Sequence, residues 1–406
     1  MLYNQRFKPQ KLKKYAKVQG GYAFKSSEYT ESGIPIVRIG DLKNNTVDIE
    51  NCVKVSNSYL DTCKNFIIKD NELLIAMTGA TVGKVAFVKN FKTHLLLNQR
   101  VGKFICDSAK IDSKYLYYVT SAQEFYNEVQ ILATGAGQPN ISPMQIENIN
   151  IPVPDSIEEQ QEIVQVLDTM SDIIRLREEC ISHAQDLIPA LFQEMFDNPQ
   201  TNKKNWQICC LKDLAKIDRQ NISPEELKTK QYTYIGLEHI EKETGRILVD
   251  PNSQQDINLK SNKFFFTNNH VLYGKLRPYL NKVALPDFDG VCSTDIFPLL
   301  PLEGISNKYF LKVLMNTSYF VNMANSQSSG ANLPRIGTTA LENIKVFKPD
   351  YTLQEQFAQK AIEIEAYIKE QQEELESAKQ MFQSLLHHAF TGELTNNKPQ
   401  GDTLEK

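Results

Sequence analysis

Apolar residues recur at three- and four-residue spacing through two long segments, residues 155–197 and 351–394. Held over about five heptads, this spacing predicts two long helices, each with one apolar stripe, and is typical of a coiled-coil seam. A polar residue interrupts each stripe once, Arg177 in the first segment and Gln371 in the second. The candidate seam residues are Ile163, Met170, Ile173, Leu187, Leu191, Phe357, Ile364, Ile368, Leu375, Phe382 and Leu385.

The ends of both segments carry helix-terminating signals. Ser156 and Thr352 are each followed three positions later by a glutamate, which predicts a capping box at both N-termini. The second copy has one extra residue, Tyr351, before its cap. Pro189 predicts a kink or a restart in the first helix, and Gly392 predicts the end of the second.

The remaining segments, residues 1–154 and 198–350, have a different pattern. Short β-rich runs alternate there with loops of Gly, Asn and Thr, which predicts two mixed α+β domains. One helix is expected in each domain, at residues 113–122 and 307–315. The tail, residues 395–406, is expected to be disordered. The predicted strands lie in residues 34–39, 72–76, 85–88, 101–105, 232–235, 270–273 and 282–285.

The two halves of the chain repeat one another. The motif Gly135-Ala136-x-x-Pro139-x-Ile141 returns as Gly330-Ala331-x-x-Pro334-x-Ile336, at an offset of 195 residues. Such a period is far too long for a solenoid, so it indicates two copies of one domain-plus-helix unit. The predicted fold class is therefore α+β: two similar domains, each followed by a long helix. The two helices are expected to pair with each other as an antiparallel coiled coil.

The net charge of −4 hides a strong segregation along the chain. The four segments 1–154, 155–197, 198–350 and 351–406 carry +6, −9, +4 and −5. The basic domains are able to face a polyanion, whereas the acidic helices are not. Charge alone leaves open whether these domains bind a nucleic acid.

One loop resembles a phosphate-binding motif but lacks its chemistry. In residues 77–85 only three residues separate the glycines, and no Ser or Thr follows Lys84 to hold magnesium. The aligned residues 275–283 contain no glycine. We interpret both segments as loops between strands that could reach phosphates and base edges, or that could be solvated hairpins. The candidate contact residues are Lys84, Lys275, Arg277, Tyr279, Asn281 and Lys282.

Further candidates lie after the run Leu95–Leu97 and in the duplicated glycine loops, residues 134–140 and 329–335. Asn, Gln and Arg are the side chains that make bidentate contacts with adenine and guanine. The second copy has Ser293-Thr294-Asp295 in place of the first of these segments, which suggests that the copies recognise different sequences. A strand end and a tight entry to the last strand remain alternatives. The candidates in these segments are Asn98, Gln99, Arg100, Gln138, Asn140 and Arg335, and Arg38 in the predicted strand 34–39 is a further candidate.

Other chemistry is missing from the sequence. There is no Asn/Asp-Pro-Pro-aromatic motif for adenine methylation and no glycine fingerprint for a dinucleotide or methyl donor. The seven cysteines and six histidines show no metal-binding spacing, so no metal or catalytic residue is expected. The cysteines are expected to be small buried residues in a reducing cytoplasm. Residues 1–14 lack the apolar stretch of a signal peptide, and no run approaches a membrane span.

The order and duplication of these features resemble the specificity subunit of type I restriction-modification systems. Each long helix follows a proline and begins near a Glu-Gln pair, Glu159-Gln160 and Glu355-Gln356. The supporting strings are Gly137-Gln138-Pro139-Asn140-Ile141-Ser142, Ile151-Pro152-Val153-Pro154 and Ala389-Phe390-Thr391-Gly392-Glu393-Leu394.

The resemblance implies a non-catalytic, cytoplasmic, DNA-binding subunit. Residues 1–154 and 198–350 would be target recognition domains for the unlike halves of a bipartite double-stranded DNA site. The helices would be a spacer that docks two methyltransferase subunits and, through them, motor-nuclease restriction subunits. S-adenosylmethionine, ATP and magnesium would belong to those partners. The alternatives are a tandem adaptor that joins proteins without DNA specificity, and a free-standing enzyme whose motifs are absent.

Overall fold

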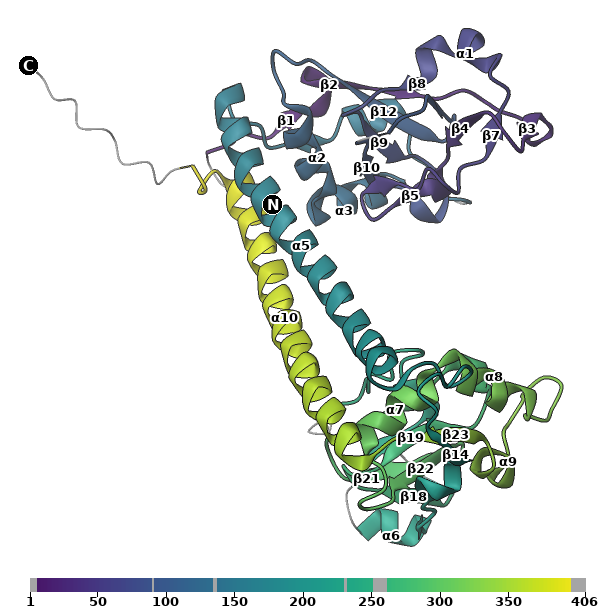
Figure 1. Ribbon diagram of the computed structural model, residues 1–406. Coiled ribbons are helices and arrows are strands. Elements are labelled where there is room, and N and C mark those ends of the chain that lie inside the picture. Colours follow the sequence, from purple (N-terminus) through teal and green to yellow (C-terminus); the bar gives the residue numbers. More distant parts are fainter. Residues whose placement is uncertain (1–5, 90, 134–136, 230–231, 251–260, 396–406) are drawn as a thin grey trace, which may run out of the picture. The chain divides into compact units, whose positions relative to one another are not determined.

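The computed structural model describes residues 6–89, 91–133, 137–229, 232–250 and 261–395. The chain forms two compact units (Figure 1). Unit 1 consists of residues 1–176 and 375–406, and unit 2 of residues 177–374. Each long helix therefore contributes one half to each unit. Of the predicted disordered tail, only Thr395 lies within the described residues.

Two sheets form the domain of unit 1. The first is antiparallel, in the order β10-β9-β12-β2, and the second has the order β3-β7-β4-β11-β8 with β4 and β11 parallel. The first sheet contains β2 (Ala16–Gly20), β9 (Leu73–Ala76), β10 (Val85–Phe87) and β12 (Val101–Cys106). The second contains β3 (Tyr29–Thr30), β4 (Ile34–Val37), β7 (Lys54–Val55), β8 (Ile67–Ile68) and β11 (Leu95–Leu97). Two small pairs are β1 (Gln10–Lys11) with β13 (Asn150–Ile151), and β5 (Leu42–Lys43) with β6 (Thr46–Val47).

Helices cover the first sheet of unit 1. The predicted helix is α2 (Ser113–Ser121), which begins where the Asp112 carboxylate accepts from the backbone N–H groups of Lys114 and Tyr115. A second helix, α3 (Gln123–Leu132), was not predicted. Extended backbone at Ala122 separates the two, and α3 buries Phe125 and Val129 in the same core. The short helices are α1 (Tyr59–Thr62) and α4 (Pro143–Glu147).

Unit 2 repeats this architecture. Its first sheet has the order β15-β22-β19-β20, and its second has the order β16-β18-β21-β17 with β17 and β21 parallel. The strands are β14 (Gln207–Cys210), β15 (Ala215–Ile217), β16 (Asn221–Ile222), β17 (Thr233–Ile235), β18 (Lys263–Phe266), β19 (Val271–Gly274), β20 (Val283–Ala284), β21 (Gly290–Cys292), β22 (Ile296–Pro301) and β23 (Lys345–Lys348). The helices are α6 (Pro224–Thr229), α7 (Lys308–Asn316), α8 (Ser318–Ser326) and α9 (Thr338–Glu342). As in unit 1, the sequence predicted only the first member of the helix pair α7–α8.

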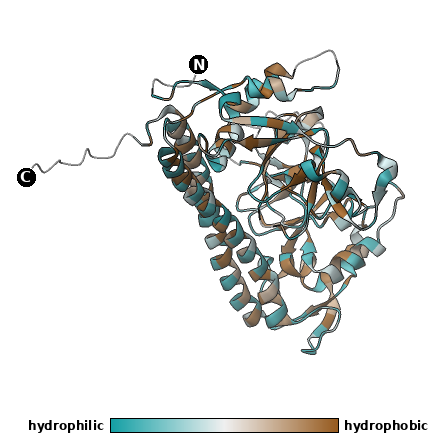
Figure 2. Cartoon of the chain, turned by 90° about the horizontal axis from the view of Figure 1, so that it is seen from above, coloured by the Kyte–Doolittle hydropathy of each residue, from teal (hydrophilic) through white to brown (hydrophobic). Residues whose placement is uncertain are grey.

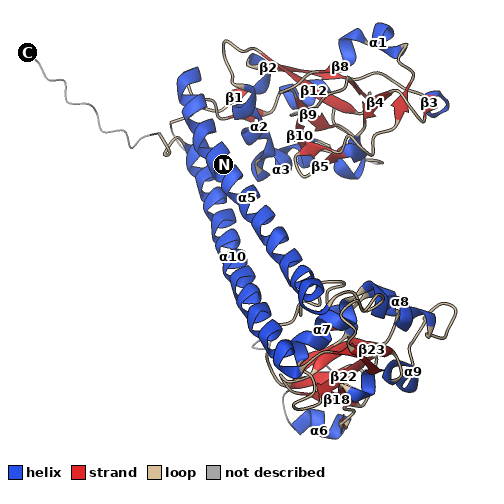
Figure 3. Cartoon of the chain, in the orientation of Figure 1, coloured by secondary structure: helices blue, strands red, loops and turns tan. Residues whose placement is uncertain are grey.

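The long helices are α5 (Ile157–Phe196) and α10 (Tyr351–Thr391), drawn in blue in Figure 3. In unit 1, Ile163 of α5 lies in the same core cluster as Ala389 near the end of α10. In unit 2, Phe192 near the end of α5 contacts Phe357 near the start of α10, with ring centroids 5.6 Å apart. Each unit thus brings together opposite ends of the two helices, as an antiparallel arrangement requires.

Two predicted seam residues are not part of a buried seam. Ile173 is 39% exposed and Leu187 is 52% exposed, whereas Ile181 and Ala184 are buried. An α-helix has 3.6 residues per turn, so an apolar stripe drifts by about 20° per heptad away from a strict seven-residue repeat. Along α10, Leu375 and Ala378 are the buried counterparts. In Figure 2 both long helices accordingly carry teal as well as brown residues.

The helix starts differ from the prediction in one copy. The Ser156 hydroxyl accepts from the backbone N–H of Glu159 at 3.1 Å, as expected for a cap. In the second copy α10 already begins at Tyr351, and the Asp350 carbonyl accepts from the N–H of Leu353, so the cap at Thr352 was wrong. Tyr351 is consequently the first helical residue and not an insertion before the cap.

Two buried glutamines show which positions of α5 and α10 correspond to each other in the repeat. Gln160 Nε2 donates to the Pro154 carbonyl at 3.4 Å, and Gln354 Nε2 donates to the Pro349 carbonyl at 3.0 Å. Gln160 therefore corresponds to Gln354 and not to Gln356, and the offset falls to 194 in the helices. The same glutamines also bind the loop before α2 or α7, through Lys110 and Ile305 carbonyls.

α5 is one continuous helix with Pro189 inside it, so the expected restart does not occur. α10 ends at Thr391, and Gly392 follows with φ +81°. A positive φ is a conformation that glycine adopts without steric cost, which confirms the predicted stop. None of the helices in the described ranges combines the length and apolar character that a membrane span requires.

Candidate nucleic-acid interface

Three loop segments that are distant in sequence lie side by side in unit 1. The backbone N–H of Met77 donates to the Arg100 carbonyl at 2.9 Å, and that of Gly79 donates to the Pro139 carbonyl at 2.8 Å. The N–H of Ile141 donates back to the Met77 carbonyl at 2.9 Å. The structure thus joins the loop between β9 and β10, the turn after β11 and the end of the glycine loop.

Unit 2 builds the same arrangement from its own residues. The N–H of Lys275 donates to the Asp295 carbonyl at 3.0 Å, and that of Arg277 donates to the Pro334 carbonyl at 2.7 Å. The N–H of Ile336 donates to the Lys275 carbonyl at 3.1 Å. The backbone hydrogen bonds match those of unit 1 one for one, while the side chains differ. We call each set of three loops the loop cluster of its unit.

The turn geometry of the first loop is also shared. Gly79 and Gly83 have φ +77° and +86°, and the corresponding Arg277 and Asn281 have φ +53° and +48°. Unit 2 therefore places two bulky side chains where unit 1 uses glycine. A left-handed conformation costs an L residue about 1–2 kcal/mol relative to glycine. The turn of unit 2 is therefore more strained than the turn of unit 1.

Most of the predicted side chains of unit 1 are presented outward. Gln99, Arg100, Gln138 and Asn140 are exposed around the loop cluster. Asn98 is only 8% exposed, and its Oδ1 accepts from the backbone N–H of Arg100 at 3.2 Å. Its side chain therefore stabilises the turn. The prediction that Asn98 is presented to DNA was wrong.

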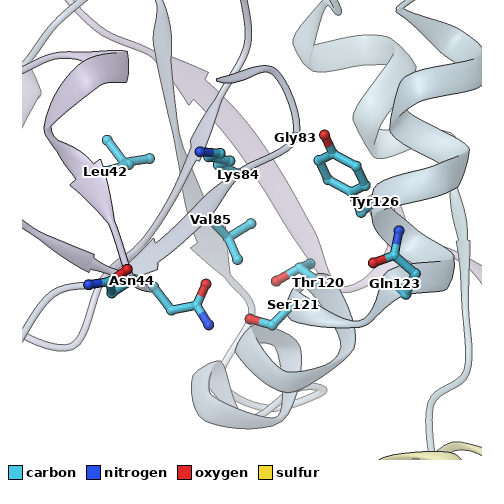
Figure 4. A pocket seen from close by; sticks show the side chains of 10 residues that line it. Leu42, Asn44, Gly83, Lys84, Val85, Thr120, Ser121, Gln123 and Tyr126 are labelled. Carbon is cyan, nitrogen blue, oxygen red and sulfur yellow. The ribbon is translucent and has the colours of Figure 1, made fainter. Parts of the chain in front are cut away.

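Two further candidates of unit 1 lie at the edge of the loop cluster. Arg38 precedes a 3-10 turn, and its Nε lies 3.5 Å from Asp41 Oδ2. Lys84 is exposed at the far end of the loop, where it helps to line a cavity of about 280 Å³ with Asn44, Gln123 and Tyr126 (Figure 4). Lys84 thus faces a polar recess beside α3.

In unit 2 one carboxylate, that of Asp295, lies between two basic side chains. Asp295 Oδ1 lies 3.3 Å from Arg335 Nε and 3.7 Å from Lys275 Nζ. The Lys275 ammonium also lies 5.3 Å from the ring centroid of Phe297. Asp295 was not among the predicted site residues, although its alignment with Arg100 marked the position as different between the copies.

The other candidates of unit 2 separate into inward and outward side chains. Lys282 Nζ donates to the Leu237 carbonyl at 2.6 Å, and Asn281 Nδ2 donates to the Asn316 carbonyl at 3.4 Å. These two side chains are engaged with the protein's own backbone rather than presented to a ligand. Tyr279 is 51% exposed, and Arg277 is partly exposed. The available surface is therefore formed by Lys275, Arg277, Tyr279 and Arg335.

The cysteines take no part in the loop clusters. Burial raises the pKa of Cys52 to about 12 and that of Cys106 to about 11, so both remain thiols at neutral pH. Cys63 and Cys292 are buried as expected, whereas Cys180 is exposed on α5. The described residues contain no group of three His, Cys, Asp or Glu side chains placed to hold a metal ion.

The family model of the type I restriction modification DNA specificity domain matches residues 4–183 and 203–377. These matches cover most of the chain, so the chain belongs to this family and contains its domain twice. Each match combines one α+β domain with a part of the long helix that follows it. The resemblance found in the sequence is thereby confirmed.

Relatives of the same kind align along the chain. The EcoDI specificity subunit of Escherichia coli is 25% identical over 405 residues, covering 86% of this chain and 88% of that protein. The MjaVIII specificity subunit of Methanocaldococcus jannaschii is 29% identical over 170 residues, covering 41% of this chain and 40% of that protein. The StySPI specificity subunit of Salmonella potsdam is 23% identical and covers 89% of this chain.

Solved structures share the fold. The S subunit of the type I restriction-modification system of M. genitalium superimposes with a TM-score of 0.57 at 14% identity, covering 95% of this chain and 96% of that one. A chain from the structural description of assembly and conformational transition in a type I R-M system gives a TM-score of 0.56 at 12% identity, covering 97% and 99%. At such identities the likeness shows the architecture alone.

Proposed function

We propose that this chain is the sequence-recognition subunit of a type I restriction-modification complex, and that each loop cluster recognises one half of a bipartite DNA site. The observation that carries the proposal is the duplicated loop cluster. Three matching backbone hydrogen bonds join its loops in both units, but its exposed side chains differ. A backbone frame shared by the two copies, with different side chains on it, is what recognition of two unlike half-sites requires.

The charges support this division of labour. Both loop clusters belong to segments with a net positive charge, whereas the segments that contain α5 and α10 carry −9 and −5. Negative helices repel phosphates but can face a basic or apolar protein surface. We therefore assign the helices to protein partners: two methyltransferase subunits, one for each copy of the repeat, and through them the restriction subunits.

Catalysis and cofactors belong to those partners in this proposal. S-adenosylmethionine would bind the methyltransferase subunits, and ATP with magnesium would bind the motor-nuclease subunits. This chain would determine the DNA sequence at which they act. The role of the exposed side chains is then to discriminate between base pairs, and the role of the helices is to hold partners and half-sites in register.

Modified-base sequencing tests the proposal directly. Plasmid DNA is isolated from cells that co-express this chain with the methyltransferase encoded beside it. We expect methylated adenine confined to one two-part motif with a fixed gap and unlike halves. If both proteins are soluble and co-purify but the DNA carries no such motif, the chain is better explained as an adaptor that joins proteins without DNA specificity.

A further inference from the structure

Arg335 has a firmly fixed backbone at the centre of the loop cluster of unit 2. Its N–H donates to the Ser329 carbonyl at 2.9 Å, and its own carbonyl accepts from the Ser329 N–H at 3.0 Å. It also forms a β-bridge with Leu276 of the neighbouring loop. The Cα of Arg335 is therefore held from two sides, and its side chain projects from a defined point.

The guanidinium of Arg335 is oriented as well as placed. Its Nε faces Asp295 Oδ1 at 3.3 Å, while the side chain remains 44% exposed. The Nη1 group reaches the Leu333 carbonyl only at 3.5 Å, the limit of a hydrogen bond. Because Nε is engaged with the carboxylate, the edge formed by Nη1 and Nη2 is the part of the fork that a ligand can meet.

Asp295 is itself fixed and neutralised. Its backbone N–H donates to Ser293 Oγ at 3.2 Å, and its carbonyl accepts from the Lys275 N–H at 3.0 Å. The Lys275 ammonium lies 3.7 Å from its carboxylate. Two cations surround one anion, so the group keeps a net positive charge and does not repel DNA.

We propose that Arg335 contacts a guanine in the half-site recognised by unit 2, and that Asp295 is the positioning residue that aims it. The inference rests on the proposed function. An arginine fork offers two parallel N–H donors, and guanine offers the matching acceptors O6 and N7 in the major groove. A lysine in the same place provides a point charge without this planar match.

Unit 1 provides the contrast that makes the inference specific. The position equivalent to Arg335 is Asn140, which forms the corresponding β-bridge with Thr78. The position equivalent to Asp295 is Arg100, whose carbonyl accepts from Met77. An amide takes the place of the fork, and there is no carboxylate at the equivalent of Asp295. A guanine contact from this position of the loop cluster is therefore expected in the half-site of unit 2 only.

The rival explanation is that Arg335 and Asp295 form an ordinary surface ion pair. Such pairs contribute little to stability. Where they contact phosphates, their loss weakens binding to all DNA sequences alike. A base-contacting pair has a different signature, because its loss changes the preference at one base pair. The test must therefore measure sequence preference and not only total binding.

The first experiment uses the unaltered complex and altered DNA, so that protein folding is not at issue. Its wild-type arm establishes the two-part motif, and absence of that motif overturns the proposed function and this inference together. In duplexes with the motif, each guanine of the unit 2 half-site is replaced in turn by 7-deazaguanine, which lacks N7. At one position we expect a loss of affinity on the order of 5-fold or more. Unchanged affinity at every position overturns the inference while leaving the proposed function intact.

Variants then assign the contact to its residues. In R335K, and more weakly in D295N, the preference for that guanine over other bases should fall by roughly 5- to 150-fold, with the unit 1 half-site unchanged. R246K is the matched control. Arg246 forms an exposed ion pair with Glu241 at 3.3 Å outside the three loops, so R246K should retain the wild-type motif. A uniform loss of methylation in R335K with the base preference intact would overturn the inference in favour of an ordinary ion pair.

Discussion

At the scale of single residues, Arg277 occupies a backbone conformation that most L residues avoid. Its φ of +53° corresponds to +77° at Gly79, in the same turn of the other unit. In addition, its Nε is buried and has no hydrogen-bond partner within the described residues. Both features cost free energy, and Arg277 is part of the loop cluster, so we infer that its side chain serves contact with a ligand.

Replacing Arg277 by glycine should therefore stabilise unit 2 while weakening DNA binding. We expect the free energy of unfolding to rise by about 1 kcal/mol, because glycine adopts the left-handed conformation without steric cost. The only tryptophan, Trp206, lies in unit 2 and is packed against its core, so its fluorescence reports the urea midpoint. DNA affinity is measured on the same protein within the complex.

The control for that experiment adds a side chain at a positive φ, whereas R277G removes one. Gly304 has φ +67° with open space around its Cβ position, so G304A should lower the free energy of unfolding by about 1 kcal/mol without affecting DNA affinity. If R277G lowers the midpoint as G304A does, the Arg277 backbone is not strained. The functional argument for this residue then loses its basis.

At the scale of elements, the polar interruptions of the two apolar stripes meet each other. Arg177 Nη1 donates to Gln371 Oε1 at 2.9 Å and also contacts Glu374, all within unit 2. A polar pair inside an apolar seam specifies register at a cost in stability. We infer that this pair selects one alignment of α5 against α10.

Replacing both members of the pair by leucine should raise stability and loosen register. In R177L/Q371L we expect the free energy of unfolding to rise by about 1–3 kcal/mol, because two leucines extend the apolar contact between α5 and α10. Thermal unfolding of the full chain measures this change. The control is R175L, since Arg175 is exposed two residues away, and it should leave the melting temperature unchanged. A fall in the melting temperature of the double variant would mean that the polar pair itself stabilises the helices.

The comparison of sequence and structure shows which elements periodicity can find. The long helices and most core strands were predicted, because their apolar pattern extends over enough residues. α3 and α8 were missed because each follows the preceding helix after one extended residue, Ala122 or Thr317, which the sequence does not distinguish from a helix end. The predicted cap at Thr352 was wrong because α10 already begins at Tyr351, so Thr352 lies inside the helix.

The candidate site was predictable as a set of segments and not as a set of contacts. The repeat marked the loops, because matching positions differed between the copies. Whether a side chain points outward depends on local geometry, as for Asn98, which closes its own turn, and Lys282, which binds the Leu237 carbonyl. The role of Asp295 depends on two cations that lie 20 and 40 positions away in the sequence.

At the scale of the whole molecule, each α+β domain is bound to a long helix by the same type of contact. In unit 1, Asp168 of α5 pairs with Lys114 and accepts from the Tyr118 hydroxyl at 2.7 Å. In unit 2, Glu365 of α10 pairs with Lys312 at 3.0 Å. The domains thus have separate cores and separate attachments, which makes each one exchangeable in principle.

Exchanging the second domain should therefore change one half of the recognised site. We would replace residues 205–346 by the corresponding residues of another family member, keeping α5, α10 and the whole of the first domain. The expected product methylates a motif with the original first half, the original gap and a new second half, because the loop cluster of unit 1 and both helices are unaltered. Modified-base sequencing of co-expressing cells measures all three properties at once. A change in both halves would show that the domains do not recognise DNA independently, and a change in the gap alone would assign spacing to the domains instead of the helices.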